Sequence, residues 1–280
     1  DVYVVDNAGD VVTELMSEGI DEVRSSIGFV LSSNLENLTL TGASNIDGSG
    51  NGLANVLTGN SGDNALDSGL GADTLDGGLG ADTLVGGLGD DIYIVDNAGD
   101  VVTELTFAGT DEVRSSIGYV LSPNFENLTL TGSNNISGTG NSLSNVLSGN
   151  SSDNTLDGGL GADTLAGGLG DDVYVVDNAG DVVIELVSEG SDEVRSSVTY
   201  TLSANVENLT LTGAGNIDGT GNDLSNVLTG NDGDNTLDGD LGADTLVGGL
   251  GHDVYAVDDV GDAVTELMFE GTDEIRSSVT

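Results

Sequence analysis

The chain lacks several residue types, and each absence excludes a class of structure or partner. It has no cysteine, no tryptophan, one proline, and only four basic residues against 49 acidic ones, so that the net charge is 4 − 49 = −45. Without cysteine it forms neither disulfides nor thiolate metal sites. A surface this anionic is unsuited to nucleic acid. No stretch approaches the roughly 18 consecutive apolar residues that insertion into a membrane requires.

Internal repetition is what the chain has in abundance. The segment DVYVVDNAGDVVTEL at Asp1 returns with few changes at Asp91, Asp172 and Asp253, so the offsets are 91 − 1 = 90, 172 − 91 = 81 and 253 − 172 = 81. We therefore divide the chain into long repeats 1–90, 91–171 and 172–252 and a partial repeat 253–280, and predict one continuous solenoid over residues 1–280. Because the pattern is cut at Asp1 and at Thr280, we interpret the chain as a segment of something longer.

A period of nine residues lies inside each long repeat. Residues 77–100, GGLGADTLVGGLGDDIYIVDNAGD, repeat a glycine pair, a third glycine, an aspartate and an apolar residue at that spacing. A period of nine does not keep residues on one face of a helix, and each glycine disfavours a helix by about 1 kcal/mol. Short strands that point one apolar side chain inward, joined by glycine turns, fit the pattern. The inward residues run from Leu57 to Val102, from Leu147 to Val183 and from Leu228 to Val264.

The predicted fold is all-β, a right-handed parallel β-roll or β-solenoid built from nonapeptide half-coils. An 81-residue repeat should contain nine strands, some of them in the looser region between residues 111 and 138. If two strands make one turn, nine strands make four and a half turns, so the repeat after an 81-residue repeat starts on the opposite side of the stack. The first repeat is one nonapeptide longer and makes five whole turns, so the second repeat starts on the same side as the first. Arg24 and Arg114 should then share a side. Arg114 and Arg195 should project from opposite sides, as should Arg195 and Arg276.

The turn aspartates are candidate ligands for a hard cation. Like charges so close repel, and the few basic residues cannot neutralise them, so the compensating charge must come from solvent. Residues two nonapeptides apart occupy equivalent turns of neighbouring coils, where two carboxylates and turn carbonyls form an all-oxygen site suited to Ca²⁺. About seven calcium ions are expected, and no other cofactor. The predicted metal ligands are Asn64, Asp73, Asp82, Asp91, Asp100, Asn154, Asp163, Asp172, Asp181, Asn235, Asp244, Asp253 and Asp262.

These units resemble a known family. GGLGADTLV, GGLGDDIYI, GGLGADTLA and GGLGDDVYV match the nonapeptide of the hemolysin-type, repeats-in-toxin (RTX) proteins. The blocks VDNAGDVVTEL and ENLTLTG match only loosely, and GNSSDNTLD departs from the pattern with Asn154 at the ligand position. The resemblance implies a calcium-binding β-roll in a bacterial protein that is exported by a type I secretion system, unfolded in the low-calcium cytosol and folded outside the cell.

Other notable residues favour structural roles. His252, the single histidine, is expected to be an exposed variant and not a catalytic group, because no partner in the repeat orients it. The arginines, each after DEV or DEI, are expected to form local ion pairs or carbonyl caps, with recognition of a partner as the alternative. The NLT triplets at Asn37, Asn127 and Asn208 are expected to be strand residues and not glycosylation sites.

Two functions stay open at this point. The first is a structural array of a secreted or cell-surface bacterial protein, such as an adhesin stalk, surface layer or extracellular filament, that becomes rigid with calcium. The second is the calcium-dependent export and folding module of a secreted enzyme or toxin whose catalytic domain lies outside the segment. We favour the first because an 81-residue unit recurs with few changes. We expect no enzyme, because no catalytic grouping recurs. The expected partners are calcium and neighbouring repeats; self-association would require calcium to screen the charge.

Overall fold

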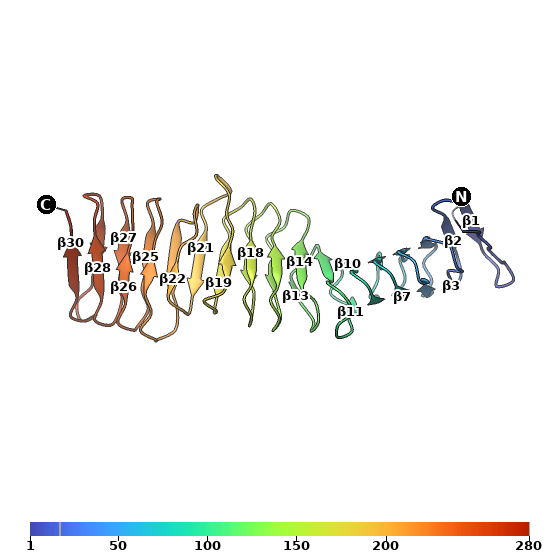
Figure 1. Cartoon of the computed structure of the whole chain (residues 1–280), viewed down its shortest axis with the longest axis horizontal. Helices are drawn as coiled ribbons and strands as arrows, with labels where there is room; N and C mark the ends of the chain where they lie inside the picture. The colour runs from blue at the N-terminus through green and yellow to red at the C-terminus, as the bar shows by residue number, and fades with distance from the viewer. Residues whose placement is uncertain (17, 280) are drawn as a thin grey trace. The chain divides into compact units, whose positions relative to one another are not determined.

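The computed structural model describes residues 1–16 and 18–279, and within them every regular element is a β-strand. The all-β prediction is therefore confirmed, while Thr280, where the repeat pattern stops, lies outside this part. The described residues contain no helix that could span a membrane. The chain divides into two compact units, Asp1–Thr131 and Gly132–Thr280. Within each unit, short parallel strands lie side by side (Figure 1).

The first unit alternates its strands, except β13, between two sheets. One sheet contains β1, β2 and the even-numbered strands from β4 to β14, and the other runs in the order β11-β9-β7-β5-β3. The strands are β1 (Val2–Val5), β2 (Glu22–Ser25), β3 (Phe29–Val30), β4 (Asn37–Leu40), β5 (Gly48–Ser49), β6 (Val56–Thr58), β7 (Ala65–Leu70), β8 (Thr74–Asp76), β9 (Thr83–Leu88), β10 (Ile92–Val95), β11 (Val101–Thr103), β12 (Glu112–Ser115), β13 (Tyr119–Val120) and β14 (Asn127–Leu130).

The second unit continues the same alternation. Odd-numbered strands from β15 to β29 form one sheet, and the even-numbered strands form two runs, β16-β18-β20 and β22-β24-β26-β28-β30. The strands are β15 (Ser137–Thr139), β16 (Val146–Ser148), β17 (Thr155–Asp157), β18 (Thr164–Ala166), β19 (Val173–Val176), β20 (Val182–Val183), β21 (Glu193–Ser196), β22 (Tyr200–Thr201), β23 (Asn208–Leu211), β24 (Gly219–Thr220), β25 (Val227–Thr229), β26 (Thr236–Asp238), β27 (Thr245–Val247), β28 (Val254–Val257), β29 (Ala263–Thr265) and β30 (Glu274–Ser277).

Strand register fixes one coil at two nonapeptides. Leu66 in β7 pairs with Leu84 in β9, and Leu75 in β8 pairs with Tyr93 in β10, so each inward residue meets the one that follows it by two nonapeptides. These inward side chains are buried, as are their equivalents in the later runs except for the half-buried Val264. The half-coil of one nonapeptide is therefore confirmed. At two strands a turn, the described strands amount to about 15 turns of a β-solenoid.

The blocks that link the regular runs form coils of other lengths. Tyr3 pairs with Val23, Val23 with Leu38 and Leu38 with Leu57, so the coil lengths are 23 − 3 = 20, 38 − 23 = 15 and 57 − 38 = 19. Together these three coils are as long as three regular coils of two nonapeptides each. The nonapeptide register is therefore restored after the linking block, although no single coil within it has the regular length.

The strand count and most of the predicted arginine positions are confirmed. The two 81-residue repeats contain nine strands each, β10 to β18 and β19 to β27. Arg24 in β2 and Arg114 in β12 lie in one sheet of the first unit, whereas Arg195 in β21 and Arg276 in β30 lie in different sheets of the second. The comparison of Arg114 with Arg195 crosses the two units and stays a prediction, as does one continuous solenoid.

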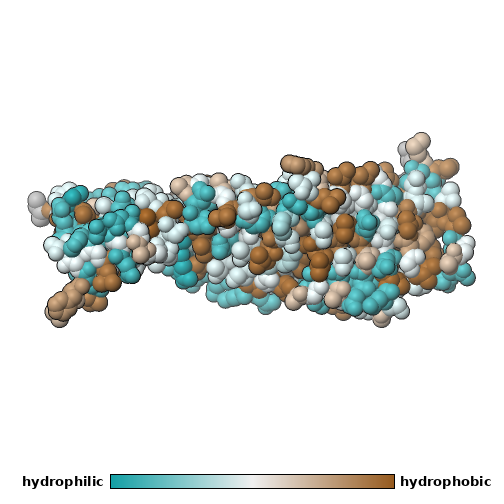
Figure 2. Space-filling view, turned by 90° about the horizontal axis from the view of Figure 1, so that it is seen from below, coloured by the Kyte–Doolittle hydropathy of each residue, from teal (hydrophilic) through white to brown (hydrophobic). Residues whose placement is uncertain are grey.

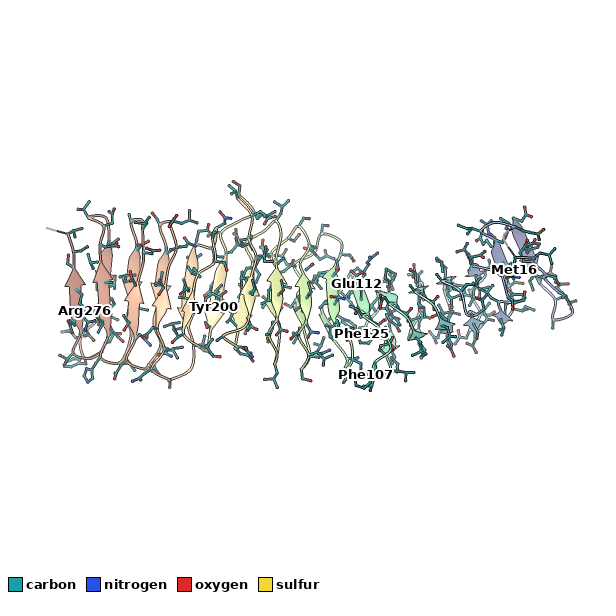
Figure 3. The ribbon with its side chains drawn as sticks, viewed as in Figure 1. Met16, Phe107, Glu112, Phe125, Tyr200 and Arg276 are labelled. Atoms are coloured by element: carbon teal, nitrogen blue, oxygen red, sulfur yellow. The ribbon has the colours of Figure 1, made fainter. Side chains whose placement is uncertain are left out.

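The surface mixes acidic and apolar residues. In the glycine turns Leu79 and Leu160 are each 68% exposed. Phe107, at the tip of a linking loop, is 99% exposed and points away from the strands (Figure 3). On the face drawn in Figure 2, apolar residues are scattered among hydrophilic ones. The apolar core is thus confined to the thin space between the sheets of each unit.

Candidate metal centres

Each glycine turn closes around the aspartate that ends it. In the turn formed by residues 77–82, Gly78 and Gly80 have φ values of 75° and 139°, which glycine adopts without strain. A Cβ at Gly77 would clash with Oδ2 of Asp82, so the carboxylate rests directly on a glycine Cα. A Cβ at Gly80 would meet the carbonyl oxygen of Gly62 on the neighbouring coil. The glycines therefore provide room for a carboxylate and a stacked carbonyl.

Hydrogen bonds bring together the predicted ligands that occupy equivalent turns of successive coils. The N–H of Asp73 donates to Oδ1 of Asp91 at 2.8 Å, and the N–H of Asp82 donates to Oδ1 of Asp100 at 3.0 Å. One oxygen of each carboxylate is thus used to tie its turn to the coil before it. The same bond joins Asp163 to Asp181, Asp244 to Asp262, Asn64 to Asp82, Asn154 to Asp172 and Asn235 to Asp253.

Seven of the predicted ligands keep a second oxygen that is buried and has no hydrogen-bond partner. Their side chains are 1% exposed, so water does not solvate this oxygen. A buried anionic oxygen without a donor destabilises the fold unless a cation or a proton neutralises it. The seven Oδ2 atoms belong to Asp73, Asp82, Asp91, Asp163, Asp172, Asp244 and Asp253.

The other six predicted ligands have both polar atoms occupied. Oδ2 of Asp100 accepts the N–H groups of Asp96 and Asn97 in its own turn, and Asp181 and Asp262 do the same. Oδ1 of Asn64 accepts an N–H at 2.8 Å and its amide donates to a carbonyl at 2.6 Å, as in Asn154 and Asn235. These residues begin and end each run by binding backbone. The geometry therefore favours the seven aspartates with a spare oxygen as ligands.

Burial raises the pKa values of the spare-oxygen aspartates. The pKa of Asp82 and that of Asp91 rise to about 6, and that of Asp172 to about 7, with smaller contributions from neighbouring carboxylates. No arginine offsets this, because each of the four pairs with the glutamate two residues before it, as Arg114 does with Glu112 at 2.8 Å. The predicted local ion pairs are confirmed. Ionised turns must therefore be neutralised from solvent.

The structure also assembles carboxylates that sequence analysis missed. Three clusters bring three carboxylate oxygens within 4.8 Å of one another. Only the first residue of each cluster belongs to a nonapeptide, so the period of nine gave no indication of the other two. The available signal was the recurrence of TEL and of DEV or DEI in the long repeats, with IEL in place of TEL in one of them. The clusters are Asp91, Glu104 and Asp111; Asp172, Glu185 and Asp192; and Asp253, Glu266 and Asp273.

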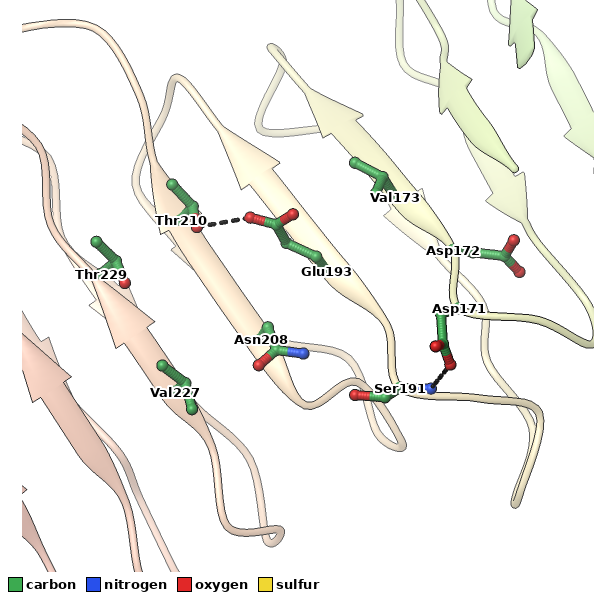
Figure 4. Close-up of a pocket in the computed structure, with 9 residues that line it drawn as sticks. All are labelled: Asp171, Asp172, Val173, Ser191, Glu193, Asn208, Thr210, Val227 and Thr229. Atoms are coloured by element: carbon green, nitrogen blue, oxygen red, sulfur yellow. Dashed lines mark hydrogen bonds between the residues drawn. The ribbon is translucent and has the colours of Figure 1, made fainter. Parts of the chain in front are cut away.

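The remaining residues have the structural roles expected of them. His252 is exposed, and its Nδ1 accepts the N–H of Thr272 just as Oδ1 of Asp171 accepts that of Ser191 (Figure 4). Asn37, Asn127 and Asn208 lie in strands β4, β14 and β23. The groove in Figure 4 is lined by acidic, hydroxyl, amide and apolar side chains, with no histidine or cysteine. Within it the hydroxyl of Thr210 donates to Glu193 at 2.7 Å, and Glu193 also pairs with Arg195 at 2.8 Å.

Comparison with known families agrees with the turn geometry. A model of the RTX calcium-binding nonapeptide repeat matches residues 49–84, 58–93, 67–102, 139–174 and 220–255. The chain carries RTX calcium-binding nonapeptide repeats. All seven spare-oxygen aspartates lie in the matched RTX segments, whereas Glu104 and Asp111 lie outside them. No curated protein matches the chain. The RTX repeats form a calcium-binding structural array, and their all-oxygen donor set fits Ca²⁺.

Proposed function

We propose that the chain is a calcium-dependent structural array of a secreted or cell-surface bacterial protein, such as an adhesin stalk, a surface layer or an extracellular filament. The observation that supports this proposal is the set of seven buried aspartate oxygens without partners, in a chain whose arginines are all engaged elsewhere. RTX repeats typically occur in secreted bacterial proteins. The fold supplies stiffness and repetition, which are the properties that a stalk or filament needs.

The aspartates have two separate tasks in this proposal. Oδ1 holds neighbouring coils together through backbone N–H groups, as in the 2.7 Å bond from Asn64 to Asp82. Oδ2 would hold calcium, and carbonyl oxygens of the glycine turns would complete the oxygen shell. Bound calcium would supply the positive charge that the chain lacks. Neighbouring turns would then attract the same ions in place of repelling one another.

Folding is expected to follow the calcium concentration. In a low-calcium cytosol, repulsion among the turns and the thin core would leave the chain disordered. Outside the cell, calcium in the roughly 0.1–1 mM range of extracellular modules would bind the native turns and stabilise them. The array would therefore pass through an export channel unfolded and become rigid only at its destination.

Circular dichroism of the chain with calcium and with chelator tests this proposal. We expect a β spectrum that appears cooperatively with calcium and is lost on chelation, together with resistance to protease only in calcium. Magnesium at equal ionic strength is the control, because it keeps its waters and fits such sites poorly. A β spectrum that survives complete chelation at low salt would remove calcium from the explanation.

The location is tested separately. An antibody raised against the array should label intact cells of the source organism or detect the protein in the medium. Detection only in the cytosolic fraction would refute the extracellular role while leaving calcium-dependent folding intact.

A further inference from the structure

We propose that the linking blocks after Asp91 and Asp172 each build a second kind of cation site, which shares its first aspartate with an RTX turn and takes its other two carboxylates from the block. Asp91, Glu104 and Asp111 form it in the first unit. Asp172, Glu185 and Asp192 form it in the second. Its ligand is a hard divalent cation of the size of calcium. The glutamate and the second aspartate of each site lie outside the nonapeptide segments.

The linking coil places the three carboxylates together. The N–H of Asp91 donates to Oδ1 of Asp111 at 2.8 Å, across a coil that is two residues longer than a regular one. Glu104 directly follows β11, and its backbone carbonyl accepts a 3.0 Å hydrogen bond from the side chain of Asn124. The second site repeats both bonds, from Asp172 to Asp192 and from Asn205 to Glu185. The cluster is thus held by the backbone of three successive coils.

Unpartnered buried oxygens point to a ligand. Oδ2 of Asp91 and Oδ2 of Asp111 are buried without a hydrogen-bond partner, and both side chains are 1% exposed. In the second site Oδ2 of Asp172 and Oε2 of Glu185 are also buried without a hydrogen-bond partner, and the two residues are 1% and 6% exposed. An ion bound at 2.3–2.6 Å from each ligand reaches oxygens up to about 5 Å apart. The three ligand oxygens lie within 4.8 Å of one another, which falls inside that range.

A buried tyrosine accompanies each site. The hydroxyl of Tyr93 donates to Glu104 and accepts the N–H of Gly86 at 2.7 Å, and the hydroxyl of Tyr174 donates to Glu185 in the same way. The ring of Tyr93 is fixed edge-on against Phe125, with centroids 5.2 Å apart. Each glutamate is therefore oriented toward the two aspartates. The tyrosine ring also lies beside the proposed ion, where it could transfer excitation energy to a luminescent ion bound in place of calcium.

Charge argues for a cation in the same place. Three carboxylates meet in each cluster, and the nearest arginine in sequence, Arg114 or Arg195, is paired with Glu112 or Glu193 at 2.8 Å. The third cluster differs in exposure, because Asp253 is buried while Glu266 and Asp273 are exposed. We expect this cluster to bind more weakly than the first two.

Glu185→Gln tests the site with little change in shape. The amide oxygen still accepts the hydroxyl of Tyr174, but one of three charges is lost. At saturating calcium, where far-ultraviolet circular dichroism must show a native β spectrum, we expect one calcium ion fewer per chain by equilibrium dialysis. Glu104→Gln should lose one ion as well, and the double variant two. Glu189→Gln, in the same loop, is the matched control and should lose none.

Terbium(III) provides a second readout, since it replaces calcium and emits when excited through a nearby tyrosine. Tyrosine-sensitised emission should fall in Glu104→Gln and Glu185→Gln, and Tyr174→Phe should lower emission more than it lowers the number of bound ions. An Asp163→Asn variant separates this inference from the proposed function. If Asp163→Asn loses an ion while Glu185→Gln keeps wild-type stoichiometry and emission, the linking site is refuted and the RTX turns are retained. If the folded wild type binds no calcium, both ideas fail.

Discussion

Replacement of Asp82 by asparagine removes the buried charge of one RTX turn and leaves its backbone hydrogen bonds in place. The new amide oxygen still accepts the N–H of Asn64, and the backbone N–H still reaches Asp100. Only Oδ2, which is buried and has no partner, is exchanged for an amide nitrogen. The substitution therefore isolates the role of this oxygen as a calcium ligand from the role of Oδ1 in coil stacking.

The expected effect changes sign with calcium. Without calcium, burial raises the pKa of Asp82 to about 6, so the ionised form disfavours folding at neutral pH. Each pKa unit corresponds to about 1.4 kcal/mol, which gives an upper bound of about 3 kcal/mol, and solvent screening at the turn reduces it to roughly 1–2 kcal/mol. With calcium at about 100 times its dissociation constant, one lost site lowers the free energy of unfolding by about 2.7 kcal/mol. The variant should then be more stable than wild type in chelator and less stable in calcium.

Two titrations measure these effects by circular dichroism. In chelator, a stabilising osmolyte is added until β structure forms, and Asp82→Asn should need less of it than wild type. In the second titration calcium is added without osmolyte, and the variant should need more calcium to fold and bind fewer ions.

Asp67→Asn is the matched control because this aspartate points outward from β7 and is exposed. It removes the same charge from a nearby nonapeptide, so a general effect of net charge would appear in both variants. Equal calcium midpoints for Asp82→Asn and Asp67→Asn would refute the assignment of Oδ2 as a ligand. A variant that is destabilised in chelator would show that Oδ2 has a favourable protein partner.

Two further predictions concern pH and the core. In chelator, β structure should increase as the pH falls from about 7.5 to about 5. Burial raises the folded-state pKa of Asp82 to about 6 and that of Asp172 to about 7, so the stability that these groups contribute is complete below the unfolded pKa and is lost as the pH rises through the folded pKa. Loss of β structure in acid, measured by circular dichroism against pH, would contradict this prediction. Leu84→Ala should destabilise the calcium-bound fold by about 2–5 kcal/mol because it leaves a cavity between the sheets, while Leu79→Ala at an exposed turn position should change stability by less than about 0.5 kcal/mol; equal urea midpoints for the two variants would refute the inward assignment.

The regular part of this fold could be predicted because one local rule generates it. Each nonapeptide has a single inward residue, and in the GG units the second and third glycines of the turn adopt positive φ, so the burial of Leu66, Leu75, Leu84 and Tyr93 follows from the sequence pattern. The pairing of equivalent turns on successive coils follows from the same rule. The predicted pairs are joined through hydrogen bonds between backbone and carboxylate, which makes Oδ1 a structural atom and leaves Oδ2 as the candidate ligand.

What escaped prediction depends on contacts that a periodic pattern does not encode. The amide of Asn64 binds a preceding carbonyl and Oδ2 of Asp100 closes its own turn, contacts that the period of nine does not indicate, while the assignment of both as ligands stays a prediction. Asp111 escaped because it lies outside the nonapeptide register of Asp91 and still meets it through the same kind of bond. Glu104 was not predicted as a ligand because it follows a short strand at a position where the period of nine does not place an acidic residue. Sequence periodicity identifies the repeated turn. The other contacts can be predicted only when the length of each coil is known, and the period of nine does not give that length.

The linking block therefore does more than connect two regular runs. Its three unequal coils replace three regular ones, so the nonapeptide register is kept while the first and longest coil gains room for a carboxylate cluster. An 81-residue repeat contains an odd number of half-coils, so the next linking block starts on the other sheet, as β19 and β28 do in the second unit. The longer first repeat returns β10 to the sheet of β1. Adding or deleting one nonapeptide would therefore move the start of the next linking block, with its acidic cluster, from one sheet to the other.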